Sequence, residues 1–155
     1  MFAVAHDKVA TGPGFYMVPR SRGFLVHMTA SPRHLRLVRG LAESMLSEAG
    51  VDAATTAAVQ LVLSELIGNA VRVCGDFVPL VVEMDPGRSG VTVKVHDPCG
   101  ERLPRRKPVA LDDDRAEDGR GLGLVDLLAP GWYTLRTPVG KQIRCRVAHE
   151  GAGRG

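Results

Sequence analysis

The chain has 155 residues, 45% of them hydrophobic, which suits one domain with a buried core and is too short for two. Its net charge of +3 is mild and only 5% of its residues are aromatic, which argues against a nucleic-acid-binding surface. No run approaches the roughly 18 apolar residues of a membrane span, and the N-terminus lacks the order of a signal peptide. We therefore expect a cytoplasmic protein that does not enter membranes.

The first half of the chain predicts an arm, one strand and two helices. Residues 1–22 are rich in glycine and proline without sustained periodicity, which predicts a flexible arm, and residues 23–29 predict the first strand. A helix should follow Ser31-Pro32, an N-cap with proline in the first turn, and end at Gly50. A second helix should begin after the N-cap Asp52 and continue to about Val73.

The second half predicts two hairpins separated by a long loop and a helix. Residues 78–84 and 90–96 are β-branched runs on either side of a turn, and residues 132–147 predict a closing hairpin. Between them, residues 98–118 have little apolar periodicity, and an apolar helical segment follows as far as about Ala129.

These elements predict an α+β domain over residues 23–148, followed by a flexible tail over residues 149–155. Adjacent strands joined by tight turns imply a mostly antiparallel sheet with the helices on one face. The three cysteines, Cys74, Cys99 and Cys145, cannot all pair and form no C-x-x-C motif, which fits a reducing compartment.

A glycine-rich run opens the last helical segment. Gly119, Gly121 and Gly123 alternate with Arg120, Leu122 and Leu124. Glycines leave backbone N–H groups uncovered and a helix start carries partial positive charge, so the run predicts an anion site, such as one for phosphate. The alternative is an ordinary flexible loop joined to a helix.

A polar pair interrupts the apolar stripe of the second helix. Glu65 and Asn69 are four residues apart and share a face. A buried carboxylate and amide need partners, which suggests Glu65 as a base and Asn69 as an oxygen ligand of Mg2+. The alternative is a surface helix with a solvated Glu65.

Asp97 ends a β-branched strand and is followed by Pro98. A carboxylate in that position can accept a hydrogen bond from an exocyclic amine such as that of adenine. A turn-initiating Asp-Pro is the alternative.

In this order the motifs resemble the GHKL ATPase superfamily, which has the Bergerat ATP-binding fold, a two-layer α/β sandwich with a long ATP lid. ELIGNA resembles its N box, Asp97 to Gly100 its first glycine box, and GRGLGL its second. The residues of these motifs and the small size of the chain look most like bacterial anti-sigma-factor serine kinases and their short ATP-binding relatives.

The resemblance implies a role for each matching residue. Glu65 would orient or deprotonate the attacking hydroxyl, Asn69 would coordinate Mg2+, and Asp97 would hold the adenine amino group. Residues 98–118 would be the ATP lid. The remaining nucleotide contacts would come from Arg72, Gly100, Gly119, Arg120, Gly121, Leu122, Gly123 and Leu124. An arginine such as Arg72 is more often simply solvated.

The chain departs from the family pattern near adenine. Cys99 and Glu101 stand at the two glycine positions of the first box, and Gln142 stands where relatives commonly carry a threonine.

The leading hypothesis is therefore an ATP- and Mg2+-dependent kinase that phosphorylates a serine on an antagonist protein, sequesters a sigma factor, or does both, as a possible homodimer. The alternative is a non-catalytic nucleotide-sensing interaction module. Nucleic-acid binding through the basic cluster at residues 102–107 is disfavoured by the neighbouring run Asp112 to Asp114.

Overall fold

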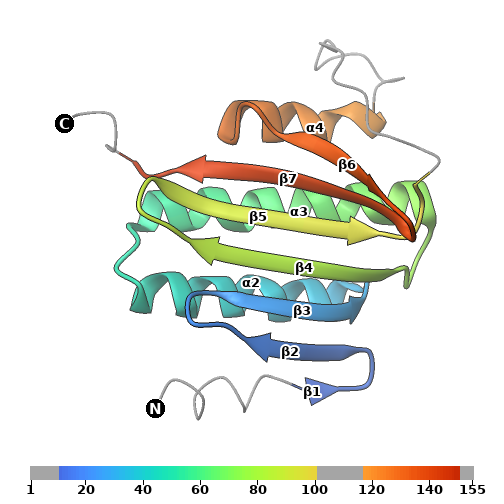
Figure 1. Ribbon diagram of the computed structural model, residues 1–155, viewed down its shortest axis with the longest axis horizontal. Helices are drawn as coiled ribbons and strands as arrows, with labels where there is room; N and C mark the ends of the chain where they lie inside the picture. The colour runs from blue at the N-terminus through green and yellow to red at the C-terminus, as the bar shows by residue number, and fades with distance from the viewer. Residues whose placement is uncertain (1–10, 101–116, 151–155) are drawn as a thin grey trace.

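The computed structural model of this chain describes residues 11–100 and 117–150, which form one antiparallel sheet with helices across one face (Figure 1). The elements in chain order are β1 (Thr11–Gly12), β2 (Phe15–Pro19), β3 (Phe24–Thr29), α2 (Pro32–Glu48), α3 (Ala53–Cys74), β4 (Pro79–Pro86), β5 (Gly90–Asp97), α4 (Glu117–Leu128), β6 (Tyr133–Thr137) and β7 (Gly140–Ala148).

Both long helices begin at the predicted caps. The Ser31 Oγ accepts a hydrogen bond from the His34 N–H at 3.1 Å, and the Asp52 carboxylate accepts one from the Thr55 N–H at 2.9 Å. The Thr55 hydroxyl also donates to Asp52, and these bonds hold the pKa of the Asp52 carboxyl below its ordinary value. The predicted boundaries of α2 and α3 are confirmed.

Within the described residues the strand order is β1-β2-β3-β4-β5-β7-β6, and each neighbouring pair is antiparallel. Side chains alternate along β5 and β7 between a buried face and a half-exposed one, as expected for a sheet covered on one side. Helices α2 and α3 lie across the covered face, and α4 packs against α3 (Figure 1). The predicted two-layer α+β class is confirmed.

The predicted N-terminal arm is wrong for residues 11–19. They form β1 and β2, and β2 pairs with β3 along its whole length, from Phe15 opposite Met28 to Pro19 opposite Phe24. Phe15 and Met17 are both buried at 3% exposure. The strand beginning at Phe24 is therefore third in the described sheet, and the domain begins before residue 23.

The predicted tail also begins later than residue 149. The His149 N–H donates to the Ser89 carbonyl at 3.3 Å, and the Glu150 N–H donates to the Thr55 hydroxyl at 2.8 Å. These bonds fix both residues against the β4–β5 turn and the start of α3.

By length and composition alone α3 could cross a membrane, with a mean hydropathy of 1.4 over its most apolar window. The sequence prediction rests on uninterrupted apolar runs, whereas α3 passes on its mean hydropathy with polar residues such as Glu65 and Asn69 inside the helix. In the fold, Val59, Val62, Leu63 and Leu66 of this helix are fully buried in the core. That is the behaviour of a core helix, which passes the same test.

Candidate functional site

Helix α3 carries the predicted polar pair toward its C-terminal end. Asn69 is 3% exposed, Glu65 is half-buried and Arg72 is exposed. Among the described residues, the Asn69 side-chain Nδ2 has no hydrogen-bond partner. Because an unpaired buried amide costs about 1–3 kcal/mol, this side chain is arranged for a group that the described residues do not supply.

Asp97 ends β5 as a fully buried carboxylate at 1% exposure. Its Oδ1 lies 3.0 Å from the Nζ of Lys141, which is 0% exposed, and accepts the Cys99 N–H at 2.8 Å. The Lys141 ammonium also donates to the Cys99 carbonyl at 2.9 Å. A buried carboxylate is thus paired and hydrogen-bonded at the end of the strand where the sequence predicts the adenine contact.

Two glycines let the backbones meet at this place. A Cβ on Gly140, whose φ is +146°, would lie 1.9 Å from the Asp97 carbonyl oxygen, and one on Gly100 would lie 2.7 Å from the Gly140 carbonyl oxygen. Neither contact is possible for a larger residue without moving the chain. Gly100 therefore has a structural reason to be glycine, in addition to its predicted nucleotide contact.

The second glycine box lies inside α4, which begins at Glu117. The sequence predicts a loop as far as residue 118 and a helix that begins with the glycine-rich run. The helix begins two residues earlier, so residues 117 and 118 are helical and not part of the loop. The N–H groups that lack a partner within a helix are those of its first turn, which include that of Gly119 but not those of Gly121 and Gly123. Leu122 is buried and Leu124 is half-buried.

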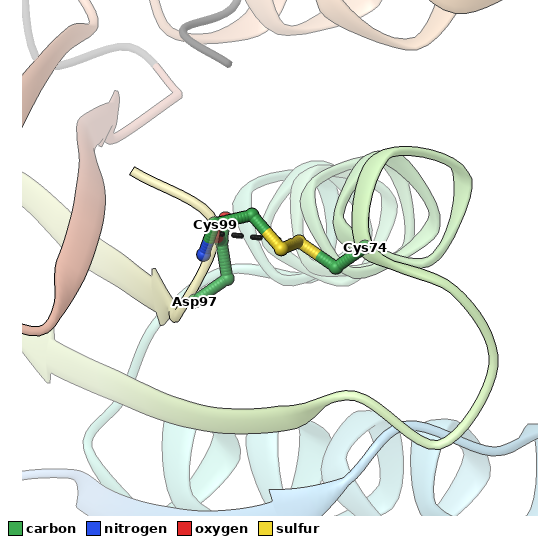
Figure 2. Close-up of side chains that lie close together, drawn as sticks. All are labelled: Cys74, Asp97 and Cys99. Atoms are coloured by element: carbon green, nitrogen blue, oxygen red, sulfur yellow. Dashed lines mark hydrogen bonds between the residues drawn. A yellow bond between two sulfur atoms is a disulfide. The ribbon is translucent and has the colours of Figure 1, made fainter. Parts of the chain in front are cut away.

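Cys74 and Cys99 form a disulfide with a Cα–Cα distance of 6.0 Å. Figure 2 shows the bond joining the end of α3 to the segment after β5, beside Asp97. As the sequence predicts, the three cysteines do not all pair, and Cys145 is free and buried.

Sequence reasoning missed Lys141 as a site residue. Along β7, every second residue from Lys141 is apolar: Ile143, Cys145 and Val147. Because side chains of a strand point to the same face at every second position, this pattern places Lys141 on the buried face. That alternation was the available signal. In the register of β5 and β7, the residue opposite Asp97 is Lys141. Gln142, which stands where relatives commonly carry a threonine, lies opposite His96.

The structure brings Asp97 and Lys141 to the C-terminal end of α3. On the same helix, Asn69 lies more than one turn before that end and Glu65 lies more than two turns before it. The predicted loop residues 101–116, including Glu101 and the basic cluster, lie outside the described residues.

A model of the histidine kinase-like ATPase domain family matches residues 28–147. The chain belongs to this family. A search of curated proteins finds no match.

Membership in the histidine kinase-like ATPase family implies ATP binding. A cavity of about 940 Å³ opens at the other end of the sheet, where Arg20, Arg88 and His149 are among its lining residues. It contains none of the residues that the motifs predict, so it is separate from the candidate nucleotide site.

Proposed function

We propose that this chain is an ATP- and Mg2+-binding regulatory kinase of the cytoplasm that phosphorylates a serine on an antagonist protein and sequesters a sigma factor. The observation that carries the proposal is the buried Asn69 amide with its unpaired Nδ2. The family match supports the ATP-binding part of it, and the resemblance of the motifs supports the rest.

The residues present fit a nucleotide with a hard cation. The two ends of an amide are assigned from their hydrogen-bonding surroundings, so Asn69 can offer either its oxygen to Mg2+ or its N–H groups to a phosphate. Bound Mg2+ would offset the charge on the phosphates. The N–H groups at the start of α4 would donate to further phosphate oxygens.

Under this proposal Glu65 acts as the base. It is half-buried, one turn before Asn69 on the same face, and forms no side-chain hydrogen bond or ion pair with the described residues. It would take the proton of the serine hydroxyl while that oxygen bonds to the γ-phosphorus and ADP leaves.

Nucleotide binding is tested by calorimetric titration of ATP with Mg2+. The Asp97→Asn and Asn69→Ala variants should each bind at least about tenfold more weakly than wild type, since each loses a hydrogen bond or ligand. Asp85→Asn, at the exposed far end of the sheet, is the matched control and should bind as wild type does. Circular dichroism checks that each variant is folded. Wild-type protein that binds no ATP would refute the proposal.

Phosphate transfer is tested with radiolabelled ATP and a candidate antagonist protein as the acceptor. Glu65→Gln should reduce transfer by about 100-fold or more while sparing ATP binding, as expected for loss of a general base. Glu43→Gln, on the exposed face of α2, is the control. Equal transfer by Glu65→Gln and wild type would remove Glu65 from this role.

A second function, a non-catalytic nucleotide sensor, is favoured by one observation. The Asp97 carboxylate is already bound to Lys141 and Cys99 and is covered from solvent. Under this alternative ATP binds without being consumed, and the measurement that separates the two is transfer of the γ-phosphate.

A further inference from the structure

The Cys74–Cys99 bond lies directly against the aspartate of the candidate nucleotide site. Cys74 is the last residue of α3, and Cys99 follows Asp97 by two residues. The Cys74 Sγ is 3.5 Å from the Asp97 Oδ1. The bond therefore joins the end of α3 to the segment after β5, beside the carboxylate (Figure 2).

In this disulfide-bonded state the carboxylate is covered. The Asp97 side chain is 2% exposed, and its Oδ1 faces the Lys141 ammonium, the Cys99 N–H and the Cys74 sulfur. Cys99 also holds Lys141 through its carbonyl. A ligand amine can approach the covered Asp97 carboxylate only if the groups around it shift, and the covalent bond holds Cys99 to the end of α3.

We propose that Cys74 and Cys99 are an oxidisable pair whose disulfide closes the adenine end of the nucleotide site and whose reduction opens it. The inference rests on the proposed function, because it concerns the same site. In the reducing cytoplasm that the sequence predicts, such a bond is transient and regulatory rather than structural.

The oxidation is balanced with a peroxide as the two-electron oxidant. The two thiols lose two electrons and two protons to form the S–S bond, and hydrogen peroxide accepts them to give two molecules of water. A dithiol reductant reverses the reaction by thiol–disulfide exchange and is itself converted to a disulfide. Both cysteines are half-buried, so small reagents can approach them.

Cys145 provides an internal control. It is 4% exposed, and burial raises the pKa of its thiol to about 12. Because the thiolate is the reactive form, Cys145 should not take part.

A metal ion is the competing occupant of the pair. The ligand atoms of Cys74, Asp97 and Cys99 lie within 4.8 Å of one another. The Lys141 ammonium at 3.0 Å from the same Asp97 oxygen repels a cation there, and this favours the disulfide.

The test compares ATP binding, with Mg2+, by the full chain after reduction with dithiothreitol and after treatment with hydrogen peroxide. Peptide mapping under non-reducing conditions should find the Cys74–Cys99 bond in the oxidised sample. We expect the oxidised protein to bind about tenfold or more weakly, since it cannot offer Asp97 to the nucleotide. Cys74→Ser, which removes one partner of the bond, should keep the reduced-state affinity after peroxide, whereas Cys145→Ser should lose affinity as wild type does.

Each result has a distinct meaning. Equal or tighter binding by the mapped, oxidised wild type overturns this inference and leaves the proposed function standing, and this comparison needs no variant to fold. Reduced protein that takes up one equivalent of Zn2+ and forms no disulfide with peroxide also overturns it. Reduced wild type that binds no ATP overturns the proposed function and this inference together.

Discussion

Lys141 and Asp97 form an ion pair that no solvent screens. Removing two charges from water is costly, and the pair is tolerated because each partner also has backbone hydrogen bonds through Cys99. The pair fixes the orientation of the Asp97 carboxylate at the end of β5, because the Lys141 ammonium and the Cys99 N–H both donate to its Oδ1. The same pairing makes both residues sensitive to any change in the other.

We predict that Lys141→Met lowers the free energy of unfolding by about 3 kcal/mol, because it leaves Asp97 buried and unpaired. Urea denaturation measures the change. Lys94→Met, on the half-exposed face of neighbouring β5, is the control and should change stability by no more than about 0.5 kcal/mol. Adding Asp97→Asn to Lys141→Met should restore part of the loss, and a variant as stable as wild type would show that the pair is not needed.

At the scale of elements, α3 joins the core to the candidate site. Its apolar face is buried, while its C-terminal turns carry Glu65, Asn69 and the disulfide-bonded Cys74. Gly68 lies between these residues, although glycine disfavours helix. Among the described residues, a Cβ added at Gly68 would meet only the Arg72 Nη1, at 3.5 Å. Packing among the described residues therefore does not require this glycine.

We predict that Gly68→Ala raises the free energy of unfolding by up to about 1 kcal/mol, by the difference in helix propensity. Thermal denaturation without nucleotide measures it. Gly140→Ala is the contrasting variant and should be strongly destabilising, because its Cβ would overlap the Asp97 carbonyl. If Gly68→Ala is instead less stable than wild type, the glycine serves the fold.

At the scale of the whole molecule, the sheet extends two strands beyond the predicted domain. β2 pairs with β3 and buries Phe15 and Met17 against the core. The candidate site and the 940 Å³ cavity lie at opposite ends of this sheet. Stability of the sheet as a unit therefore depends on the N-terminal strands.

We predict that Phe15→Ala lowers the free energy of unfolding by about 3–5 kcal/mol, as for other buried phenylalanines. Tyr16→Ala is the matched control, since Tyr16 is the next residue of the same strand and is 57% exposed. Chemical denaturation of both variants tests the assignment. Similar stabilities for the two would mean that β2 contributes little to the fold.

The sequence by itself determined the local features. The caps Ser31 and Asp52, with apolar periodicity, predict α2 and α3 because each helix is stabilised by residues close in the chain. Glu65 and Asn69 share a face for the same reason, since a helix sets that spacing. The β-branched runs and short turns predict the two hairpins.

Only the tertiary structure decided the rest. β2 has no periodic signal, because its partner is β3 and strand stability comes from such neighbours. Lys141 meets Asp97 across 44 residues and Cys74 meets Cys99 across 25, and both contacts exist because β5 pairs with β7 and ends beside α3. The residues were visible in the sequence, but their proximity is a property of the sheet order.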